Sequence, residues 1–208
     1  MKNLLNQINK IKNSEVKGTI DSRLAEFYSL GRKSSKELFR ELCFCILTAN
    51  FRADRSIYVQ KEIGDGFLIL SKTELAARLK GLGCRFHTNK AGYIVEARKH
   101  ADSIKDISAS FENPVELREW LVKNVKGLGY KEASHYLRNT GHNDVAIIDF
   151  HILDVLAEYG LAEKPKTMTK KRYLEIENTL KKLSSKAGLS LGELDLYLWY
   201  IETGTVLK

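Results

Sequence analysis

A lysine and an aspartate in this chain have the chemical types and the placement that a nucleophilic reaction requires. Lys131 lies in the first turn of a predicted helix, where the helix dipole opposes a positive charge and favours the neutral amine. Asp149 comes eighteen positions later, after the apolar run Val145–Ile148, and begins the next predicted helix, Phe150–Tyr159. An amine with a carboxylate facing it could attack an electron-poor sugar carbon. The alternative is a surface lysine and an aspartate that only caps its helix.

The segment around this lysine has the pattern of two helices joined by a tight turn. Apolar residues recur at helical spacing over 115–124 and 131–139, and the connection contains Gly127 and Gly129. These glycines let the backbone turn sharply with positive φ and leave the amides of the turn facing outward. Such amides at a helix N-terminus, beside Lys126, suit a phosphate group. An ordinary helical hairpin without a ligand is the alternative.

Start signals for helices occur along most of the chain. Capping boxes of the form Ser-x-x-Glu begin at Ser34, Ser71 and Ser190, and each predicts a helix start. Asn113 followed by Pro114 predicts another. Only two prolines occur, and there is no strand pattern that would support a β-domain. We therefore expect an all-α protein.

Length and composition limit the class of protein. The 208 residues are enough for one large or two small domains with a core that needs no disulfides. Cys43, Cys45 and Cys84 have no metal-binding spacing, so we expect reduced thiols in the core and no metal site. The 34 basic and 26 acidic side chains leave a charge of +8, which favours nucleic acid first, or an anionic membrane surface second, as the partner.

Membrane and export signals are missing from the sequence. No stretch is long and apolar enough for a membrane span, and Met1–Lys10 is too polar for a secretory signal. We therefore expect an intracellular protein that does not act at a membrane.

The Gly-x-Gly turn, the lysine at the next helix start and the later aspartate resemble the signature of the helix-hairpin-helix DNA glycosylase superfamily. No cysteine follows Cys84, whereas the iron–sulfur branch of that superfamily carries a cysteine cluster near its C-terminus. Further segments are similar to the compact 8-oxoguanine DNA glycosylase/AP lyase branch, namely Leu42–Asn50, Gln60–Gly64, Asp195–Trp199 and the last residue, Lys208. The resemblance extends from about Asn13 to Lys208.

This resemblance implies a two-lobed helical fold with the active-site cleft between the lobes and no added β-domain. We expect residues 1–208 to form a single unit, with lobe A roughly 1–60 plus 165–208 and lobe B roughly 61–164. Lobe B would contain the hairpin motif, residues 114–139.

The resemblance also implies a reaction. Lys131 would attack C1′ of the 8-oxoguanine nucleotide in double-stranded DNA and displace the base, while Asp149 would stabilise the developing positive charge. The Schiff base would then allow β-elimination of the 3′ phosphate, which is the AP lyase step, without a cofactor. The alternatives are a glycosylase of the same fold for another damaged base and a non-catalytic helix-hairpin-helix DNA-binding module. Nothing in the sequence demands more than a monomer.

A pocket for the extruded base is implied at Phe86, Trp199 and Lys208. By resemblance, Phe86 lines the pocket, Trp199 stacks on the base, and the carboxyl end of Lys208 reads the base's edge. Gly204 would let the last residues fold back toward the cleft. A plain core position is the alternative for Trp199, and the interface between two halves is the alternative for Phe86.

Contacts to the DNA backbone are expected from Lys126, Gly127 and Gly129 of the hairpin and from His151, near the start of the following helix. The alternative for His151 is a local capping partner. Phe150 departs from the resembling family, which often carries a basic residue at that position.

Overall fold

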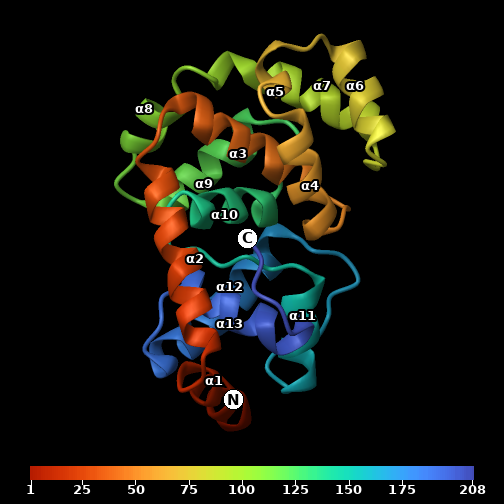
Figure 1. Ribbon diagram of the computed structural model, residues 1–208. Helices are drawn as coiled ribbons and strands as arrows, with labels where there is room; N and C mark the ends of the chain where they lie inside the picture. The colour runs from red at the N-terminus through yellow and green to blue at the C-terminus, as the bar shows by residue number, and fades with distance from the viewer.

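The computed structural model describes residues 1–208, which form helices joined by short connections and contain no β-strand (Figure 1). The expected all-α fold is therefore confirmed. No helix combines the length and the apolar character that crossing a membrane demands. In chain order the elements are α1 (Lys2–Lys12), α2 (Val16–Gly31), α3 (Ser35–Thr48), α4 (Ala53–Ile63), α5 (Gly66–Ile69), α6 (Lys72–Gly81), α7 (His87–Ala97), the 3-10 turn η1 (Arg98–His100), α8 (Ile104–Ala109), α9 (Pro114–Asn124), α10 (Tyr130–Asn139), α11 (Phe150–Glu158), α12 (Lys170–Ala187) and α13 (Leu191–Thr203).

Local start signals set several of these helices. In α3, α6 and α13 the side chain of Ser34, Ser71 or Ser190 accepts a hydrogen bond from the backbone three residues later, and the glutamate there accepts one in return. At α9 the side chain of Asn113 accepts a hydrogen bond from the backbone N–H of Val115. The sequence therefore predicts these four helix starts correctly.

The buried apolar residues form two separate cores, which define two lobes. One core of 27 residues extends from Leu38 to Val145, and we call the helices around it, α3–α10, the hairpin lobe. The other core of 20 residues takes Leu4 to Phe27 from the start of the chain and Ala146 to Leu198 from its end. We call its helices, α1, α2 and α11–α13, the terminal lobe. Figure 1 shows the hairpin lobe above the terminal lobe.

The limits of these cores differ from the expected lobe limits. α3 and α4 lie in the hairpin lobe although residues 1–60 were expected in lobe A, and α11 lies in the terminal lobe although it falls within 61–164. The reason is the burial of α3, in which nearly every residue from Leu38 to Thr48 is covered. Such a helix needs neighbours on every side, and α4, α7, α8 and α10 supply them.

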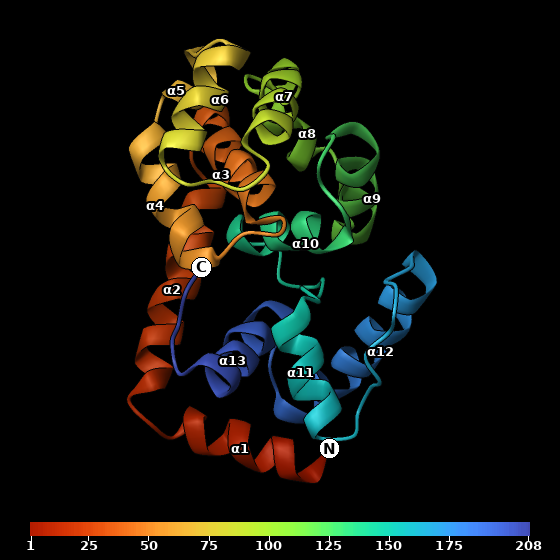
Figure 2. The same cartoon turned by 90° about the vertical axis from the view of Figure 1, so that its right-hand side faces the viewer.

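Segments of the chain also connect the lobes. α2 begins in the terminal core and its end packs against α10 of the hairpin lobe. After α13 the chain turns at Gly204, where φ is +69°, and the last residues return to the hairpin lobe, as Figure 2 shows. The hairpin between α9 and α10 and the start of α11 thus lie where the two lobes meet.

Candidate active site

The hairpin between α9 and α10 uses its two glycines differently. Gly127 has a φ of +90°, and a Cβ added there would lie 2.4 Å from Cδ2 of Tyr93, so this position requires glycine. Gly129 instead has a φ of −92° and a ψ of −173° and is the N-cap of α10. Its N–H donates to Oε2 of Glu132 at 3.2 Å. Leu128, between the glycines, is buried.

Lys131 is the second residue of α10, and its side chain is partly covered, with 22% of its surface exposed. Its Nζ lies 3.9 Å from Oε1 of Glu132. Asp149 is the N-cap of α11, and its Oδ1 accepts a hydrogen bond from the N–H of Ile152 at 3.0 Å. Asp149 therefore caps its helix, as one interpretation expected. The cap uses Oδ1 only, so Oδ2 remains able to contact another group.

Asp195 on α13 relates these two side chains to each other. The pKa of the Asp195 carboxyl is raised to about 6, chiefly by burial and in smaller part by the charge of Asp149, while Arg138 and Lys131 oppose the shift. Asp195 forms a buried ion pair with Arg138 of α10. This ion pair joins α10, which carries Lys131, to α13, which packs against α11 and so lies beside the helix that Asp149 caps.

Three aromatic side chains meet at the start of α11, which Asp149 caps. The ring centroids of His151 and Trp199 are 4.5 Å apart in an edge-to-face arrangement, and Phe150 lies 3.8 Å from His151. Phe150 is 65% exposed. Both Nε1 of Trp199 and Nδ1 of His151 are buried without a hydrogen-bond partner. The structure thus brings Trp199 and His151 together beside Asp149.

Phe86 belongs to the other lobe. It is the N-cap of α7, with a φ of +56°, and 53% of its surface is exposed. Its ring contacts the guanidinium of Arg85, whose Cζ lies 5.3 Å from the ring centroid. The structure therefore does not pack Phe86 against Trp199, which lies on α13 of the terminal lobe. A left-handed conformation at a bulky residue costs free energy, so the backbone of Phe86 is strained.

Lys208 is anchored in the hairpin lobe by its side chain. Its Nζ donates to Oε2 of Glu41 at 2.8 Å and to Oε1 of Gln60 at 2.6 Å. The same amine lies 4.1 Å from the centroid of the Phe44 ring. Glu41 is only 3% exposed, so its carboxylate needs such a partner. The tail therefore crosses the junction between the lobes and ends against α3 and α4.

His135, one turn beyond Lys131 on α10, connects the two lysines. Burial lowers the pKa of His135 well below its usual value, and the charges of Arg138, Lys131 and Lys208 lower it further. Its imidazole is therefore neutral, and neither ring nitrogen has a hydrogen-bond partner in the protein. The ring of His135 packs edge-on against Phe44, with centroids 5.5 Å apart, and Lys208 Nζ lies 4.1 Å from the centroid of the same Phe44 ring, so the end of the tail lies near α10.

Lys126 lies on the exposed side of the hairpin. Its side chain is 63% exposed, and its Nζ is 3.9 Å from Oε2 of Glu96 and 5.8 Å from the ring centroid of Tyr93. An exposed pair of this kind is weak and could exchange for a phosphate. A hollow of about 600 Å³ lies elsewhere, between the starts of α9 and α13 and the side of α12, and none of the expected site residues lines it.

Sequence reasoning missed several buried charges around the site. Arg118 and Glu177 form an ion pair in which both side chains are almost fully covered. Lys90 is also buried, donates to the carbonyl of Leu47 at 2.7 Å, and has a pKa lowered by burial. The available signal was a charged residue on the apolar face of a helix, such as Glu177 beside Ile176.

The two-lobed helical fold and its glycine hairpin place this protein in the class of helix-hairpin-helix DNA glycosylases. Within that class, the sequence pattern described as 8-oxoguanine DNA glycosylase matches residues 20–189. The chain belongs to this family.

Relatives and solved structures agree with this assignment. A protein of Methanocaldococcus jannaschii described as an 8-oxoguanine DNA glycosylase/AP lyase is 56% identical over 206 residues, which are 99% of each chain. A protein of Korarchaeum cryptofilum with the same description is 54% identical over 99% of this chain and 98% of its own.

The crystal structure of the M. jannaschii glycosylase/lyase in complex with DNA containing 8-oxoguanine has a TM-score of 0.96 and 56% identity, and the match covers 99% of each chain. The crystal structure of the Thermotoga maritima 8-oxoguanine DNA glycosylase has a TM-score of 0.93 and 44% identity, over 100% of this chain and 99% of that one. The fold is thus that of solved 8-oxoguanine DNA glycosylases along its whole length.

Proposed function

We propose that this protein excises 8-oxoguanine from double-stranded DNA and then cuts the strand at the resulting abasic site, with Lys131 as nucleophile and Asp149 as the carboxylate partner. The observation that carries the assignment of residues is the buried ion pair between Arg138 and Asp195, which joins the helix of Lys131 to α13, and α13 packs against the helix that Asp149 caps. Family membership and the M. jannaschii relative, whose structure holds 8-oxoguanine DNA, support the substrate.

The proposed reaction begins with a neutral amine on Lys131. Its nitrogen forms a bond to C1′ while the bond from C1′ to the base breaks, and the base leaves with that electron pair and takes up a proton. The carboxylate of Asp149 stabilises the positive charge that develops on the sugar, and accepts the proton that the amine loses. The N-cap geometry of Asp149 supports this role, because Oδ1 is fixed by Ile152 and Oδ2 is not.

Strand cleavage follows from the covalent intermediate. The sugar ring opens to a Schiff base between Lys131 and C1′, and loss of a proton from C2′ expels the 3′ phosphate by β-elimination. Hydrolysis of the Schiff base returns the amine. The chain needs no metal or redox partner for these steps, because every bond change is a proton or electron-pair transfer.

We propose that the extruded base is bound by Phe86, Trp199 and Lys208. The buried, unpaired Nε1 of Trp199 supports a partner supplied by substrate. Guanine has only an acceptor at N7, whereas 8-oxoguanine carries a proton there, so one acceptor at the carboxyl end of Lys208 would discriminate between them. An unmatched buried polar group costs about 1–3 kcal/mol. The anchoring of Lys208 Nζ on Glu41 supports a fixed position for that acceptor.

We propose that the hairpin and the start of α11 bind the DNA backbone. Gly127 is half-buried beside Tyr93 and its positive φ makes the turn, and Lys126 next to it is exposed. The Gly129 amide would first have to leave Glu132, so its contribution is expected to be smaller than that of Gly127. His151 would contact the phosphate next to the extruded nucleotide. We further propose that the enzyme works as a monomer inside the cell.

Borohydride trapping tests this proposal, because borohydride fixes a Schiff-base enzyme covalently to its DNA. We expect an adduct on a duplex with 8-oxoguanine and none on the undamaged duplex. Lys131→Gln should abolish the adduct while leaving DNA binding largely intact. Lys123→Gln, which removes the same charge from an exposed position on α9, is the matched control and should trap normally. An adduct that persists in Lys131→Gln would move the nucleophile to another lysine, Lys126 first.

A further inference from the structure

The segment that precedes Asp149 is buried but has no regular secondary structure. Val145–Ile148 belongs to no helix or strand, and Ala146, Ile147 and Ile148 are 2%, 5% and 3% exposed. A buried backbone N–H or C=O without a hydrogen bond costs free energy, so these groups must be satisfied from outside the segment. What satisfies them also decides where Asp149 lies.

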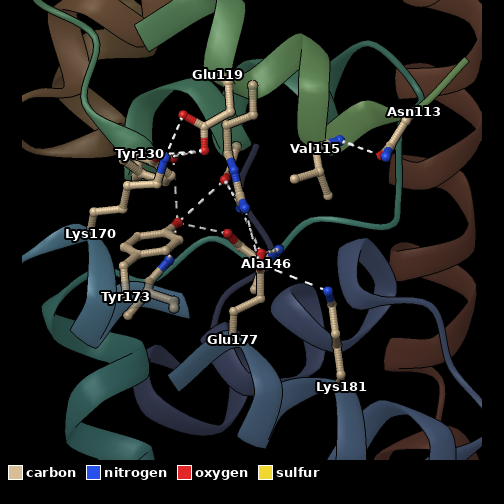
Figure 3. A network of polar contacts seen from close by, with 12 residues as sticks. Asn113, Val115, Glu119, Tyr130, Ala146, Lys170, Tyr173, Glu177 and Lys181 are labelled. Carbon is tan, nitrogen blue, oxygen red and sulfur yellow. Dashed lines mark hydrogen bonds and ion pairs between the residues drawn. The ribbon is translucent and has the colours of Figure 1, made fainter. Parts of the chain in front are cut away.

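Two side chains of α12 satisfy three of these backbone groups, the N–H and C=O of Ala146 and the N–H of Ile148. Tyr173 donates its hydroxyl proton to the carbonyl of Ala146 at 2.7 Å and accepts from the N–H of Ile148 at 3.3 Å. Glu177, one turn further along α12, accepts from the N–H of Ala146 through Oε1 at 2.9 Å. Figure 3 shows Tyr173 and Glu177 converging on Ala146. The last residues before Asp149 are therefore held by side chains rather than by a helix or a sheet.

The same two side chains also reach the helix that carries Lys131. The Tyr173 hydroxyl lies 3.3 Å from Oγ of Ser134, which is one turn beyond Lys131 on α10. Arg118 of α9 donates to the two oxygens of Glu177 at 2.6 and 3.0 Å and to Ser134 at 3.2 Å. Tyr173, Glu177 and Arg118 are each at least 98% buried.

Aromatic rings close this network on the side of the hairpin. The guanidinium carbon of Arg118 lies 5.2 Å from the ring centroid of Tyr130 and 5.6 Å from that of Tyr173. Tyr130 is the first residue of α10, and its hydroxyl donates to Glu119 (Figure 3). The start of α10 and the segment before α11 are thus held by one buried set of contacts that crosses the lobe junction.

We propose that Tyr173, Glu177 and Arg118 are positioning residues that fix Lys131 and Asp149 relative to each other. This inference rests on the proposed function of those two side chains. None of the three positioning residues needs to touch DNA, because each acts through the backbone at 146–148 or through α10. A shift of the carboxylate by a fraction of an ångström would slow attack on the sugar without weakening the grip on DNA.

Tyr173→Phe is the sharpest test, because it removes one hydroxyl and leaves the ring beside Arg118. We expect the single-turnover rate of base release from an 8-oxoguanine duplex to fall about ten- to hundredfold. The dissociation constant for a duplex carrying a tetrahydrofuran abasic site should stay within about threefold of that of the unaltered protein, because the DNA contacts are untouched. Rate profiles against pH should keep their midpoints and lose height, because the network positions groups and does not titrate.

The matched control is Tyr197→Phe, which removes the hydroxyl of another buried tyrosine of the same core, one that is not among the hydrogen-bond partners of the 146–148 segment. It should leave the rate unchanged. Ser134→Ala is a second test. It removes only the contacts of Tyr173 and Arg118 with α10, so it should slow base release less than Tyr173→Phe does. Each rate is measured well below the melting temperature of its variant, so that loss of folded protein does not enter.

The inference is overturned if Tyr173→Phe and Ser134→Ala release the base at the normal rate, even when their melting temperatures fall. It is also overturned if the rate falls only in proportion to weakened DNA binding. Failure of the proposed function would give a different result. If the unaltered protein forms no covalent adduct with DNA in borohydride, the assignment of Lys131 as nucleophile is wrong, whatever the positioning residues do.

Discussion

Replacement of Lys208 by methionine tests how the tail is held. The change keeps a long apolar stem but removes the amine that donates to Glu41 at 2.8 Å and to Gln60 at 2.6 Å. Glu41, 3% exposed, would then keep only hydrogen bonds from the amides of Asn139 at 2.6 Å and Gln60 at 3.1 Å. A buried carboxylate would thus lose its only direct counter-charge.

The expected loss of stability follows from these contacts. A hydrogen bond to a charged group contributes about 1.5–3 kcal/mol, and we expect about 2 kcal/mol because the side chain of Lys208 is 18% exposed. In a chain of this length, a loss of that size lowers the melting temperature by about 4–8 °C. The preference for 8-oxoguanine over guanine should also fall, because the acceptor at the carboxyl end is no longer fixed. Deletion of Lys208 should abolish that preference.

Calorimetry and single-turnover excision on matched duplexes with 8-oxoguanine or guanine measure both effects. Lys61→Met is the control, since Lys61 is exposed and adjacent to Gln60 in sequence. Adding Glu41→Gln to Lys208→Met should recover part of the stability, because a neutral amide is cheaper to leave buried than a carboxylate. A melting temperature that matches the control, together with an unchanged base preference, would refute the reasoning.

Two further predictions concern the hairpin and Asp195. Gly127→Ala should lower the free energy of unfolding by about 1–3 kcal/mol, because it combines a positive φ with a Cβ 2.4 Å from Tyr93. Gly129→Ala, whose Cβ would meet only a flexible Glu132 oxygen at 3.2 Å, should cost clearly less in the same urea titration, and equal losses would contradict the geometry. Asp195 has a folded pKa of about 6, above its ordinary 3.8, so the folded state binds the extra proton between these values. The stability of the unaltered protein relative to Asp195→Asn should therefore fall as the pH rises from about 4 to 6, by up to about 1.4 kcal/mol per pH unit, and a flat difference would count against it.

Local features of this fold are readable from sequence because the cause lies within a few residues. The serine and glutamate of a capping box satisfy each other's backbone, as at Ser34 and Ser190, whatever the rest of the protein does. Asp149 at a helix start is a similar case, since its carboxylate caps α11 within three residues. The glycine turn followed by Lys131 belongs to the same group.

Features that depend on distant partners could not be predicted in this way. The lobe limits follow from how α3 is covered by helices far along the chain, which no local pattern encodes. Arg118 and Glu177 lie fifty-nine positions apart, so although Glu177 falls on the apolar face of its helix, nothing local to either residue identifies the other as its partner. The left-handed conformation and exposure of Phe86 at the start of α7 are likewise not signalled by the residues around it.

The buried pair of Arg118 and Glu177 joins a helix of the hairpin lobe to a helix of the terminal lobe. Sliding one lobe over the other would strand a guanidinium and a carboxylate against apolar surroundings, and breaking such a pair costs about 3–5 kcal/mol. The hairpin lobe and the terminal lobe are therefore held rigidly relative to each other. When DNA binds, the conformational change then takes place in the DNA, whose helix bends and releases the damaged nucleotide from its stack.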